Sequence, residues 1–462
     1  MKTFLDVGVI RVQSWLTLAP NLHARRGAST MIRKATEPEA VRQMLRELGL
    51  ESAALRCDEA GHIDGVIPLR ILDDSKKKDV ERHVVRHLQA KLPGASLKTQ
   101  HCEGKDWLSA HHSAGSSQSF EWPAVVLEWP MAKVCDWCHR LPATHEAIRV
   151  PDDSGQTPFK DLCIGCIQRL PDGGYSTGKP GEEPGPEKDL LELLPGRKVP
   201  DRTKSLAELG EVQDNTHLAT VYADGNAIGR LGRSLRKLQE PDSDATTFEL
   251  PGAISSATWS SLIDAVTSID TGDTPVLPII AHLVGGDDVL VSVPAHKAWR
   301  FTRTLLEKFS EHLGTALNEA GLGHLETPSI SAGVVIHHHT TPFADVIELA
   351  DALLKHSKRH GRAKPALAWH DITHEGPEML PGQPFLTLED FQDCFGPLNK
   401  LFGLSASQRL TLLDYAQANE DLLLQQAQRL DHRDVIEPFI TGPLRIAQAL
   451  SIVRWWRSDE PA

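Results

Sequence analysis

The sequence has no uninterrupted apolar run close to the roughly 20 residues that a helix needs to cross a bilayer. Its opening residues, MKTFLDVGVIRV, also lack the long apolar core and the cleavage site of a secretory signal peptide. From both absences we expect no membrane partner and a cytoplasmic location.

Positive charge is scarce as well. The 49 lysines and arginines are outnumbered by 62 aspartates and glutamates, which leaves a net charge of −13. A surface that coats nucleic acid unaided needs an excess of positive charge, so this composition argues against that class of protein. The apolar content of 40% and the charged content of 24% are ordinary for a globular protein, and the 462 residues allow about three domains of ~100–200 residues each.

Only seven cysteines occur, and four of them form two C-x-x-C pairs with 24 residues between the pairs. Two such pairs are typical of a structural zinc site, because two thiolates from each pair complete a tetrahedron around the ion. The predicted zinc ligands are Cys135, Cys138, Cys163 and Cys166. Four sulfurs leave no position open for catalysis, so the predicted role is stabilising. A redox role is the alternative, but the neighbouring βαβ pattern is absent.

An acidic turn lies in the stretch HLVGGDDVLVSV, residues 282–293. Apolar runs flank Gly285, Gly286, Asp287 and Asp288, and this pattern predicts a tight hairpin with two carboxylates at its bend. Adjacent carboxylates repel unless a cation offsets them, which favours a hard divalent ion. Because side chains alternate along a strand, one of the two aspartates is the better candidate ligand. An ordinary turn is the alternative, and the neighbouring segments decide between them.

The segments around this turn predict a ferredoxin-like βαββαβ unit. In that unit the first strand lies beside the hairpin, so Asp224 comes close to Asp287 and Asp288. Three carboxylates are the minimum equipment for phosphoryl transfer with two metal ions. The elements are a strand at 218–223 that ends in Asp224-Gly225-Asn226, a helix at 230–238, the hairpin, a helical period from Trp299 to Leu313 and a strand at 329–336.

Four stretches, YADGN, GGDDVLVSVPA, SISAGVVIHHHTTP and ELADALLKHSK, resemble the palm of the large, polymerase-like subunit of type III CRISPR interference complexes. The resemblance implies a nucleotidyltransferase that makes cyclic oligoadenylates from ATP when the complex senses target RNA. It implies Mg²⁺ or Mn²⁺ on Asp224, Asp287 and Asp288, and it implies other CRISPR effector subunits, guide RNA and target RNA as partners. The residues that we expect to contact nucleotide are Gly285, Gly286, Asn226, Ser331, Lys358 and Ser29.

The N-terminal third resembles the first, degenerate palm of the same family. A strand at 4–10 runs into a short helical segment, Arg11-Val-Gln-Ser-Trp-Leu16, and then into Arg25-Arg-Gly-Ala-Ser29. No acidic hairpin occurs near Asp58 to Asp64, so we expect this half to lack catalysis. We expect it to supply the acceptor pocket, with backbone donors and small side chains at Gly8, Gln13, Ser14 and Gly27 to Ser29. An unrelated α/β domain is the alternative.

The predicted fold class is α/β (α+β), with two ferredoxin-like palms, a zinc-ribbon-like insert and a C-terminal α-helical domain. Further predicted strands lie at 66–71 and 124–128, and His337 to His339 are expected at a solvated strand end. The predicted division is a first palm at 1–133, a zinc-binding element at 134–171, a Gly/Pro-rich linker at 172–212, the second palm at 213–375 and the helical domain at 376–462.

Three further expectations concern function. The single His-Asp pair, His370-Asp371, lacks the other histidines of a nuclease site, so we expect it to be structural and expect no DNA cleavage. A non-catalytic scaffold that holds guide and target RNA is one rival interpretation. A stand-alone nucleotide cyclase that resembles diguanylate cyclases is another, and the zinc element, first palm and helical tail disfavour it.

Overall fold

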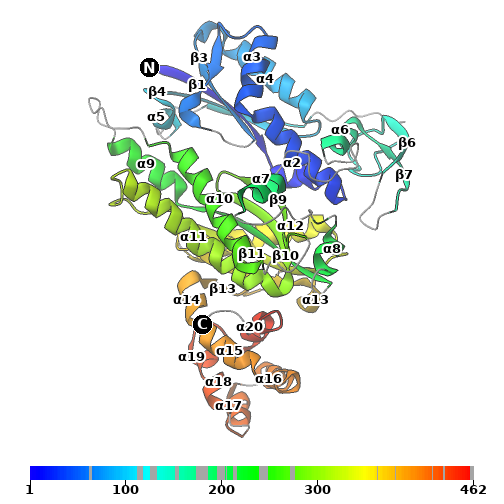
Figure 1. Ribbon diagram of the computed structural model, residues 1–462, viewed down its shortest axis with the longest axis vertical. Coiled ribbons are helices and arrows are strands. Elements are labelled where there is room, and N and C mark those ends of the chain that lie inside the picture. The colour runs from blue at the N-terminus through cyan, green and yellow to red at the C-terminus, as the bar shows by residue number, and fades with distance from the viewer. Residues whose placement is uncertain are drawn as a thin grey trace.

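The computed structural model describes residues 1–61, 65–111, 118–124, 133–150, 156–172, 186–194, 203, 205–211, 216–238, 248–270, 276–361, 363–379, 381–418, 420–429 and 432–457. Three layers follow one another along its long axis (Figure 1): an N-terminal sheet with its helices, a central sheet with its helices, and a C-terminal group of helices.

The N-terminal sheet has the strand order β2-β3-β1-β4-β5. Its first four strands repeat the ferredoxin-like arrangement, as predicted, and β5 extends one edge. Alternate residues of β1, namely Leu5, Val7 and Val9, pack beneath α2, α3 and α4, whereas Phe4 faces α5. We call this unit the first palm. Its elements are β1 (Lys2–Ile10), α1 (Val12–Leu16), α2 (Leu22–Thr36), α3 (Pro38–Glu47), β2 (Ala54–Arg56), β3 (Val66–Ile71), α4 (Lys77–Lys91), β4 (Ser96–Gly104), α5 (Trp107–His111) and β5 (Gln118–Trp122).

The central sheet has the strand order β13-β12-β11-β8-β10-β9. The four strands β11, β8, β10 and β9 form the predicted ferredoxin-like unit, which we call the second palm. Helices α10 and α11 pack on one face of this sheet, and α12 packs on the other. The elements are β8 (His217–Asn226), α9 (Ile228–Leu238), α10 (Leu250–Ile269), β9 (Ile280–Gly285), β10 (Asp288–Pro294), α11 (Ala298–Glu319), β11 (Ser329–His338), α12 (Phe343–Gly361), β12 (Ala366–Asp371), α13 (Ile372–Glu375) and β13 (Phe385–Thr387).

Two details of the second palm differ from the sequence-based expectation. Helix α10 was not predicted, although its buried residues recur at helical spacing and Pro251 stands in its first turn. His337 is not solvated, because β11 continues to His338 and the His337 ring lies fully buried against the Thr220 hydroxyl at 2.9 Å.

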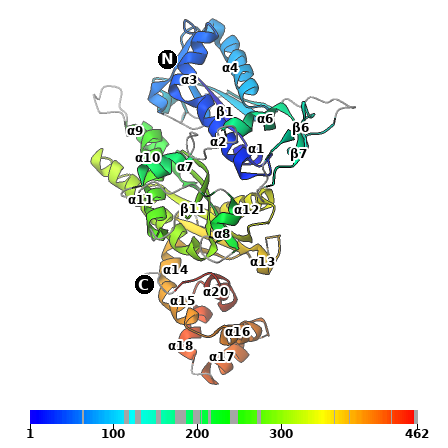
Figure 2. The same ribbon diagram turned by 45° about the vertical axis from the view of Figure 1, so that its right-hand side comes forward.

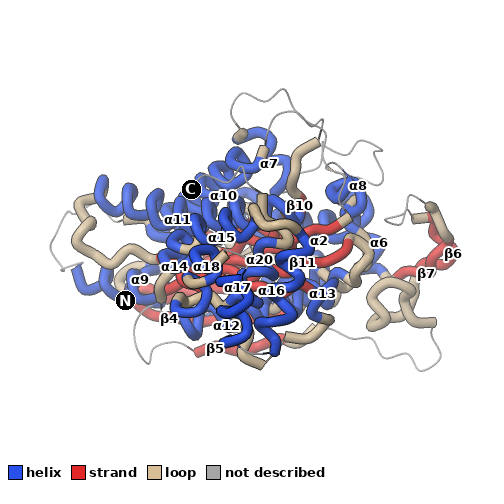
Figure 3. The backbone as a smooth tube through the Cα atoms, turned by 90° about the horizontal axis from the view of Figure 1, so that it is seen from below, coloured by secondary structure: helices blue, strands red, loops and turns tan. Residues whose placement is uncertain are grey.

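The zinc element comprises β6 (His145–Arg149), β7 (Phe159–Leu162), α6 (Ile164–Asp172) and the residues around them from 133 onward. It stands to one side of the first palm in Figures 2 and 3, with α6 packed on α2. That packing is close: a Cβ added to Gly27 of α2 would come within 1.8 Å of the Arg169 carbonyl oxygen of α6. A small residue is therefore required where these two helices cross.

Much of the predicted linker at 172–212 and residues 125–128 of the predicted strand at 124–128 lie outside the described residues. Two short helices of the linker are described, α7 (Pro186–Leu193) and α8 (Leu206–Glu211). Helix α7 is tied to the first palm by a buried ion pair between Arg26 and Glu187, at 2.7 Å, and by a second pair between Arg33 and Asp189.

The described residues from Leu388 onward are helical, as predicted, but β13 lies within the predicted helical domain at 376–462 and pairs with β12 as the edge of the central sheet. Trp456 packs on Phe391 and Phe395, and these helices share one apolar core with the second palm. Among the described residues, no helix combines the length and apolar character needed to cross a membrane. The helices are α14 (Leu388–Asp393), α15 (Phe395–Phe402), α16 (Ala406–Ala418), α17 (Glu420–Arg429), α18 (Arg433–Ile436), α19 (Pro438–Thr441) and α20 (Ile446–Val453).

Candidate functional site

The acidic hairpin forms as predicted. Strand β9 ends at Gly285 and β10 begins at Asp288, which pairs with Gly285, so Gly286 and Asp287 make a two-residue turn. Gly286 has φ +59°, in the left-handed region that glycine adopts without strain. The turn is fixed to α10 by a hydrogen bond of 2.7 Å from the Thr258 hydroxyl to the Gly286 carbonyl.

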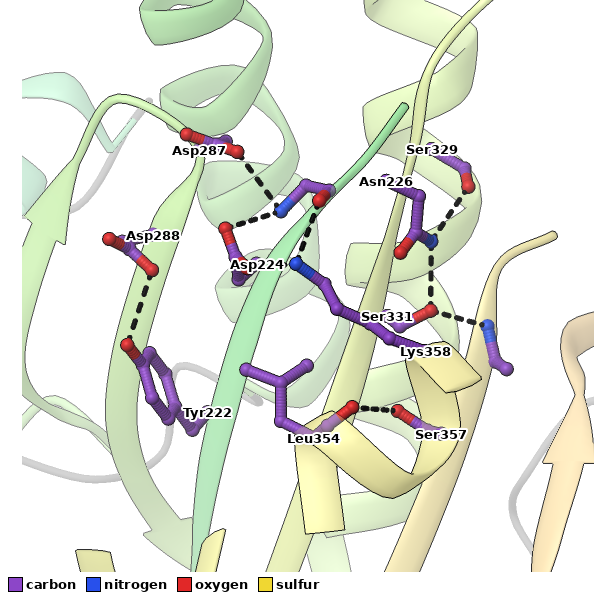
Figure 4. Close-up of polar contacts among 12 residues, drawn as sticks. Tyr222, Asp224, Asn226, Asp287, Asp288, Ser329, Ser331, Leu354, Ser357 and Lys358 are labelled. Atoms are coloured by element: carbon purple, nitrogen blue, oxygen red, sulfur yellow. Dashed lines mark hydrogen bonds and ion pairs between the residues drawn. The ribbon is translucent and has the colours of Figure 1, made fainter. Parts of the chain in front are cut away.

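Asp224 lies on β8, the strand next to β10 (Figure 4). The backbone N–H of Gly225 donates to both Asp224, at 2.8 Å, and Asp287, at 3.1 Å, so one peptide group joins two of the carboxylates. A Cβ on residue 225 would meet the Asp287 carboxylate at 2.2 Å. The glycine of the YADGN stretch is thus needed for the hairpin to approach β8.

Asp288 points away from Asp287, as strand alternation predicts. Its carboxylate accepts a hydrogen bond of 3.3 Å from the Tyr222 hydroxyl of β8. That hydroxyl is also contacted by the Gln13 side chain of α1 in the first palm. From the sequence alone, no role was predicted for Tyr222. The signal that could have identified it is its position two residues before Asp224, which places both side chains on the same face of β8.

The site is short of positive charge. Burial and the nearby charge of Asp287 raise the pKa of Asp288 to about 7, and burial also raises the pKa of Asp287. A divalent cation that prefers oxygen ligands would offset the negative charge of these carboxylates. The residues present therefore fit Mg²⁺ or Mn²⁺.

Lys358 of α12 supplies the cation that the site does hold. Its ammonium group pairs with the Asp224 carboxylate and donates to the Gly225 carbonyl at 2.7 Å. Burial lowers the pKa of Lys358 to about 8. The lysine therefore lies directly at the acidic cluster, as the resemblance implied, and its contact with a triphosphate stays a prediction.

Asn226 and Ser331 are buried between strands rather than directed at open space. The Asn226 amide donates to Ser331 at 2.8 Å and to Ser329 at 3.0 Å, and the Ser331 hydroxyl accepts from the Ala366 N–H at 3.2 Å. These bonds hold β8, β11 and β12 in register beside the acidic cluster. Direct contact between Asn226 or Ser331 and a nucleotide stays a prediction.

The first palm repeats the backbone of the second without its carboxylate. Ala227, with φ 62°, follows Asp224 by three residues, and Arg11, with φ 55°, follows Gly8 by the same interval. Both left-handed residues mark the end of the first strand of their palm. Gly8 thus stands where the second palm has Asp224, in agreement with a degenerate palm.

Ser29 lies in the interior of α2, where it is 8% exposed. The expectation that Gly27 to Ser29 offer free backbone donors is wrong, because interior helical N–H groups bond to carbonyls four residues back. Ser29 does border a cavity of about 80 Å³ that it shares with Trp259 and Val284, next to the hairpin. This cavity is smaller than the ~300–1,000 Å³ of most small-molecule sites, so the acceptor role of Ser29 stays a prediction.

The four predicted zinc ligands come together. Among the described residues, Cys135, Cys138, Cys163 and Cys166 form a buried group whose sulfur atoms all lie within 4.8 Å of one another. Four thiolates in that space fit tetrahedral Zn²⁺. His370 and Asp371 are fully buried at the end of β12, where Asp371 accepts from the Trp455 indole at 2.9 Å, which is a structural contact.

Comparisons with known proteins agree with this geometry. Residues 217–368 match the family described as Cas10/Cmr2, second palm domain. The comparison with curated proteins found no match.

Solved structures of similar fold include a Csm1–Csm4 cassette in complex with cA4, with 11% identity and a TM-score of 0.56, where the similarity covers 98% of this chain and 69% of the other. The cassette without ligand has 13% identity, a TM-score of 0.54 and coverage of 98% and 70%. Csm1 from T. onnurineus has 11% identity, a TM-score of 0.53 and coverage of 98% and 69%. At these identities the likeness concerns the fold. Residues 217–368 therefore match the second palm domain of the Cas10/Cmr2 family, and the chain as a whole shares the fold of these Csm1 structures.

Proposed function

We propose that the chain is a nucleotidyltransferase that makes cyclic oligoadenylates from ATP within a type III CRISPR-like antiviral complex. The observation that carries this proposal is that the carboxylates of Asp224 and Asp287 accept from the same Gly225 N–H, with Lys358 paired to Asp224. Asp288 follows Asp287 directly, on the strand next to β8. A half-buried acidic cluster with one adjacent lysine suits a substrate that brings both phosphate and divalent cations.

Asp224, Asp287 and Asp288 would hold the cations, whose chemistry when bound is to lower the pKa of a ribose hydroxyl and to stabilise charge on the phosphorus. The hydroxyl oxygen of one ATP then bonds to the α-phosphorus of another as the bond to pyrophosphate breaks. Lys358 leaves Asp224 for the triphosphate and offsets the charge of the leaving group. The Arg230 to Lys237 segment of α9 is a second source of cations for the triphosphate.

The acceptor nucleotide needs a surface that directs its hydroxyl at the α-phosphorus of the donor, within ~3–3.5 Å. In this proposal the first palm supplies that surface, because its helix α2 packs on β9 beside the hairpin and Gln13 of α1 contacts Tyr222. The small cavity at Ser29, about 80 Å³, would have to widen for this role.

The proposed partners are suggested by the structures of similar fold. Several of these are Csm1–Csm4 cassettes, and some are in complex with cA4 or AMPPNP. We infer a corresponding partner subunit for this chain, with guide and target RNA held by the assembled complex. Zinc at the four cysteines would stabilise the insert and take no part in the chemistry.

The test is product analysis. The purified chain, alone and together with the proteins encoded beside it, is incubated with each nucleoside triphosphate and Mg²⁺. The proposal predicts pyrophosphate release from ATP and phosphatase-resistant adenylate rings by mass spectrometry. Binding of guide and target RNA without any pyrophosphate release would favour the scaffold alternative.

A further inference from the structure

We propose that the first palm orients the Asp288 carboxylate through Gln13 and Tyr222, and that the zinc element holds this arrangement in place through Arg169. Gln13, Tyr222 and Arg169 are then positioning residues for a metal ligand. The inference rests on the proposed function only in taking Asp288 as a cation ligand; it does not depend on which nucleotide reacts.

The first step joins Tyr222 to Asp288. An ionised carboxylate can only accept hydrogen bonds, so the Tyr222 hydroxyl must be the donor in their 3.3 Å contact. Tyr222 is 4% exposed, and its ring lies in the core between β8 and α12, so the hydroxyl has little freedom to turn elsewhere. This bond selects one orientation of the Asp288 side chain.

The second step joins the two palms. With its proton committed to Asp288, the Tyr222 oxygen can only accept from Gln13, and the amide Nε2 of Gln13 is the atom that contacts it. A side chain from the first palm thereby stands one residue away from a carboxylate of the second palm. Two side-chain hydrogen bonds, from Gln13 to Tyr222 and from Tyr222 to Asp288, therefore link the first palm to Asp288.

The third step concerns α1, which carries Gln13. The helix is only five residues long and follows Arg11, whose left-handed backbone is unfavourable for a side-chain-bearing residue. Such a segment keeps its conformation only where its surroundings hold it. The Trp15 indole donates to the Pro93 carbonyl at 3.0 Å, which fixes one side of α1.

Arg169 holds the other end of α1. Its guanidinium donates to the carbonyls of Trp15, at 2.9 Å, and Leu16, at 3.3 Å, and lies 4.3 Å from the centre of the Trp15 ring. These are C-terminal carbonyls of the helix, which have no partner within it and favour a cation. At 1% exposure, Arg169 is among the largest fully buried side chains of the described chain.

The last step leads to the zinc cysteines. Arg169 lies on α6 three residues after Cys166, a spacing that places both on one side of the helix. Cys163 directly precedes α6, so the four-sulfur group fixes the start of the helix that presents Arg169 to α1. A zinc tetrathiolate also carries a net negative charge, which compensates a buried guanidinium.

The experiment is a titration of the full-length, zinc-loaded chain with Mn²⁺ alone, read by the electron paramagnetic resonance of free and bound Mn²⁺. Hydrogen-bond partners of metal ligands typically change metal affinity by ~10–100-fold. We expect Tyr222→Phe to weaken the tightest Mn²⁺ site about 10-fold and Gln13→Leu to weaken it several-fold. The double variant should match Tyr222→Phe alone, because Gln13 acts through the hydroxyl that Tyr222→Phe removes.

Arg169→Met tests the link to zinc. The methionine side chain keeps most of the buried volume, and all four cysteines remain, so metal analysis should still find zinc. The Mn²⁺ affinity of this variant should fall as it does in Gln13→Leu. Arg169→Lys, which keeps the charge and can bond one carbonyl, should recover part of the loss. Gln43→Leu is the matched control, because Gln43 is an exposed glutamine of the same palm whose side chain donates a hydrogen bond to Glu47. The Mn²⁺ affinity of this variant should equal that of wild type.

Unchanged Mn²⁺ affinity in Tyr222→Phe, or in Gln13→Leu, overturns the proposal. Additive losses in the double variant overturn the route through Tyr222, and zinc-loaded Arg169→Met with wild-type affinity overturns the link to the zinc element. ATP turnover measured on the same samples separates this inference from the proposed function. If the variants show the expected Mn²⁺ affinities but no sample forms oligoadenylate, the inference is retained and the proposed function is rejected. If oligoadenylate forms but the Mn²⁺ affinities do not change as expected, the function is retained and the inference is rejected.

Discussion

The ammonium group of Lys358 pairs with the carboxylate of Asp224, so a lysine of α12 occupies one of the three carboxylates that form the acidic cluster. A divalent cation and this ammonium compete for the same oxygens. Under the proposed function, nucleotide would resolve the competition, because its triphosphate would offer the lysine a new partner while its cations bind the carboxylates. The proposal therefore predicts that metal binds more readily together with ATP than alone.

Lys358→Met should therefore change the two affinities in opposite directions. Without nucleotide, Mn²⁺ should bind more tightly, because Asp224 has lost its competing cation, whereas ATP should bind about 10-fold more weakly. Calorimetric titrations with Mn²⁺ alone and with ATP in excess Mn²⁺ measure both quantities. Lys355→Met is the matched control, because Lys355 is exposed on the same helix and pairs with Asp351; weaker binding of both ligands to Lys358→Met would contradict the competition.

Gly225→Ala should displace Asp287. The added methyl would lie 2.2 Å from the Asp287 carboxylate and 2.7 Å from the Ile228 side chain, so either the hairpin or β8 has to shift. Overpacking of this kind costs about 1–3 kcal/mol in the free energy of unfolding, which urea denaturation measures. Gly396→Ala adds the same methyl where no atom lies within 4 Å, and it should leave stability unchanged or slightly raised. Equal stabilities of the two variants would show that the approach of hairpin and strand is not tight.

Cys135→Ser and Cys163→Ser should each abolish zinc binding. The wild-type chain should contain one zinc per molecule by mass spectrometry of the metal content, and loss of zinc should unfold the zinc element, since metal contributes an apparent ~10–16 kcal/mol in zinc-finger peptides. Cys394→Ser, at a buried cysteine outside the group, should retain the metal. A freshly purified wild-type sample without zinc would refute this assignment.

The stability of the first palm should fall in alkali because of His111 and Asp6, whose side chains lie 2.5 Å apart. Burial opposes protonation of His111, but the hydrogen bond and the charge of Asp6 outweigh it and raise the pKa to about 10. The unfolded pKa is about 6.5, so the stabilisation is complete below pH ~6.5 and is lost as pH rises through about 10. The loss is at most about 5 kcal/mol, because one pKa unit corresponds to ~1.36 kcal/mol.

Urea unfolding between pH 6 and pH 10.5 measures this effect, with Asp6→Asn as the comparison. The variant should be less stable than wild type near neutral pH, and the difference should shrink toward pH 10.5. A difference that stays constant across the range would mean that the pair does not carry the pH dependence.

The sequence was informative where chemistry leaves a local pattern. Spaced cysteines, a glycine-flanked acidic turn and alternating apolar strands depend on neighbours in the chain, and the hairpin, the sheet of the second palm and the cysteine group followed from them. The sheet of the first palm was expected from the family resemblance. Contacts between distant residues left no such pattern. Gln13 and Tyr222 meet only because α1 reaches across to β8, and Arg169 reaches α1 only through the packing of α6 on α2. The burial of His337 likewise depends on Thr220 of a neighbouring strand.

The most direct test of the account is pyrophosphate release from ATP by the assembled complex, compared between wild type and the Asp287→Ala/Asp288→Ala variant. The double variant should stay folded, because it removes two half-buried neighbouring carboxylates that repel each other, as the effect of the Asp287 charge on the pKa of Asp288 indicates. We predict metal-dependent pyrophosphate release by wild type and none above background by the variant, at equal thermal stability. Release at the wild-type rate by the folded variant would show that the acidic hairpin is not the catalytic site.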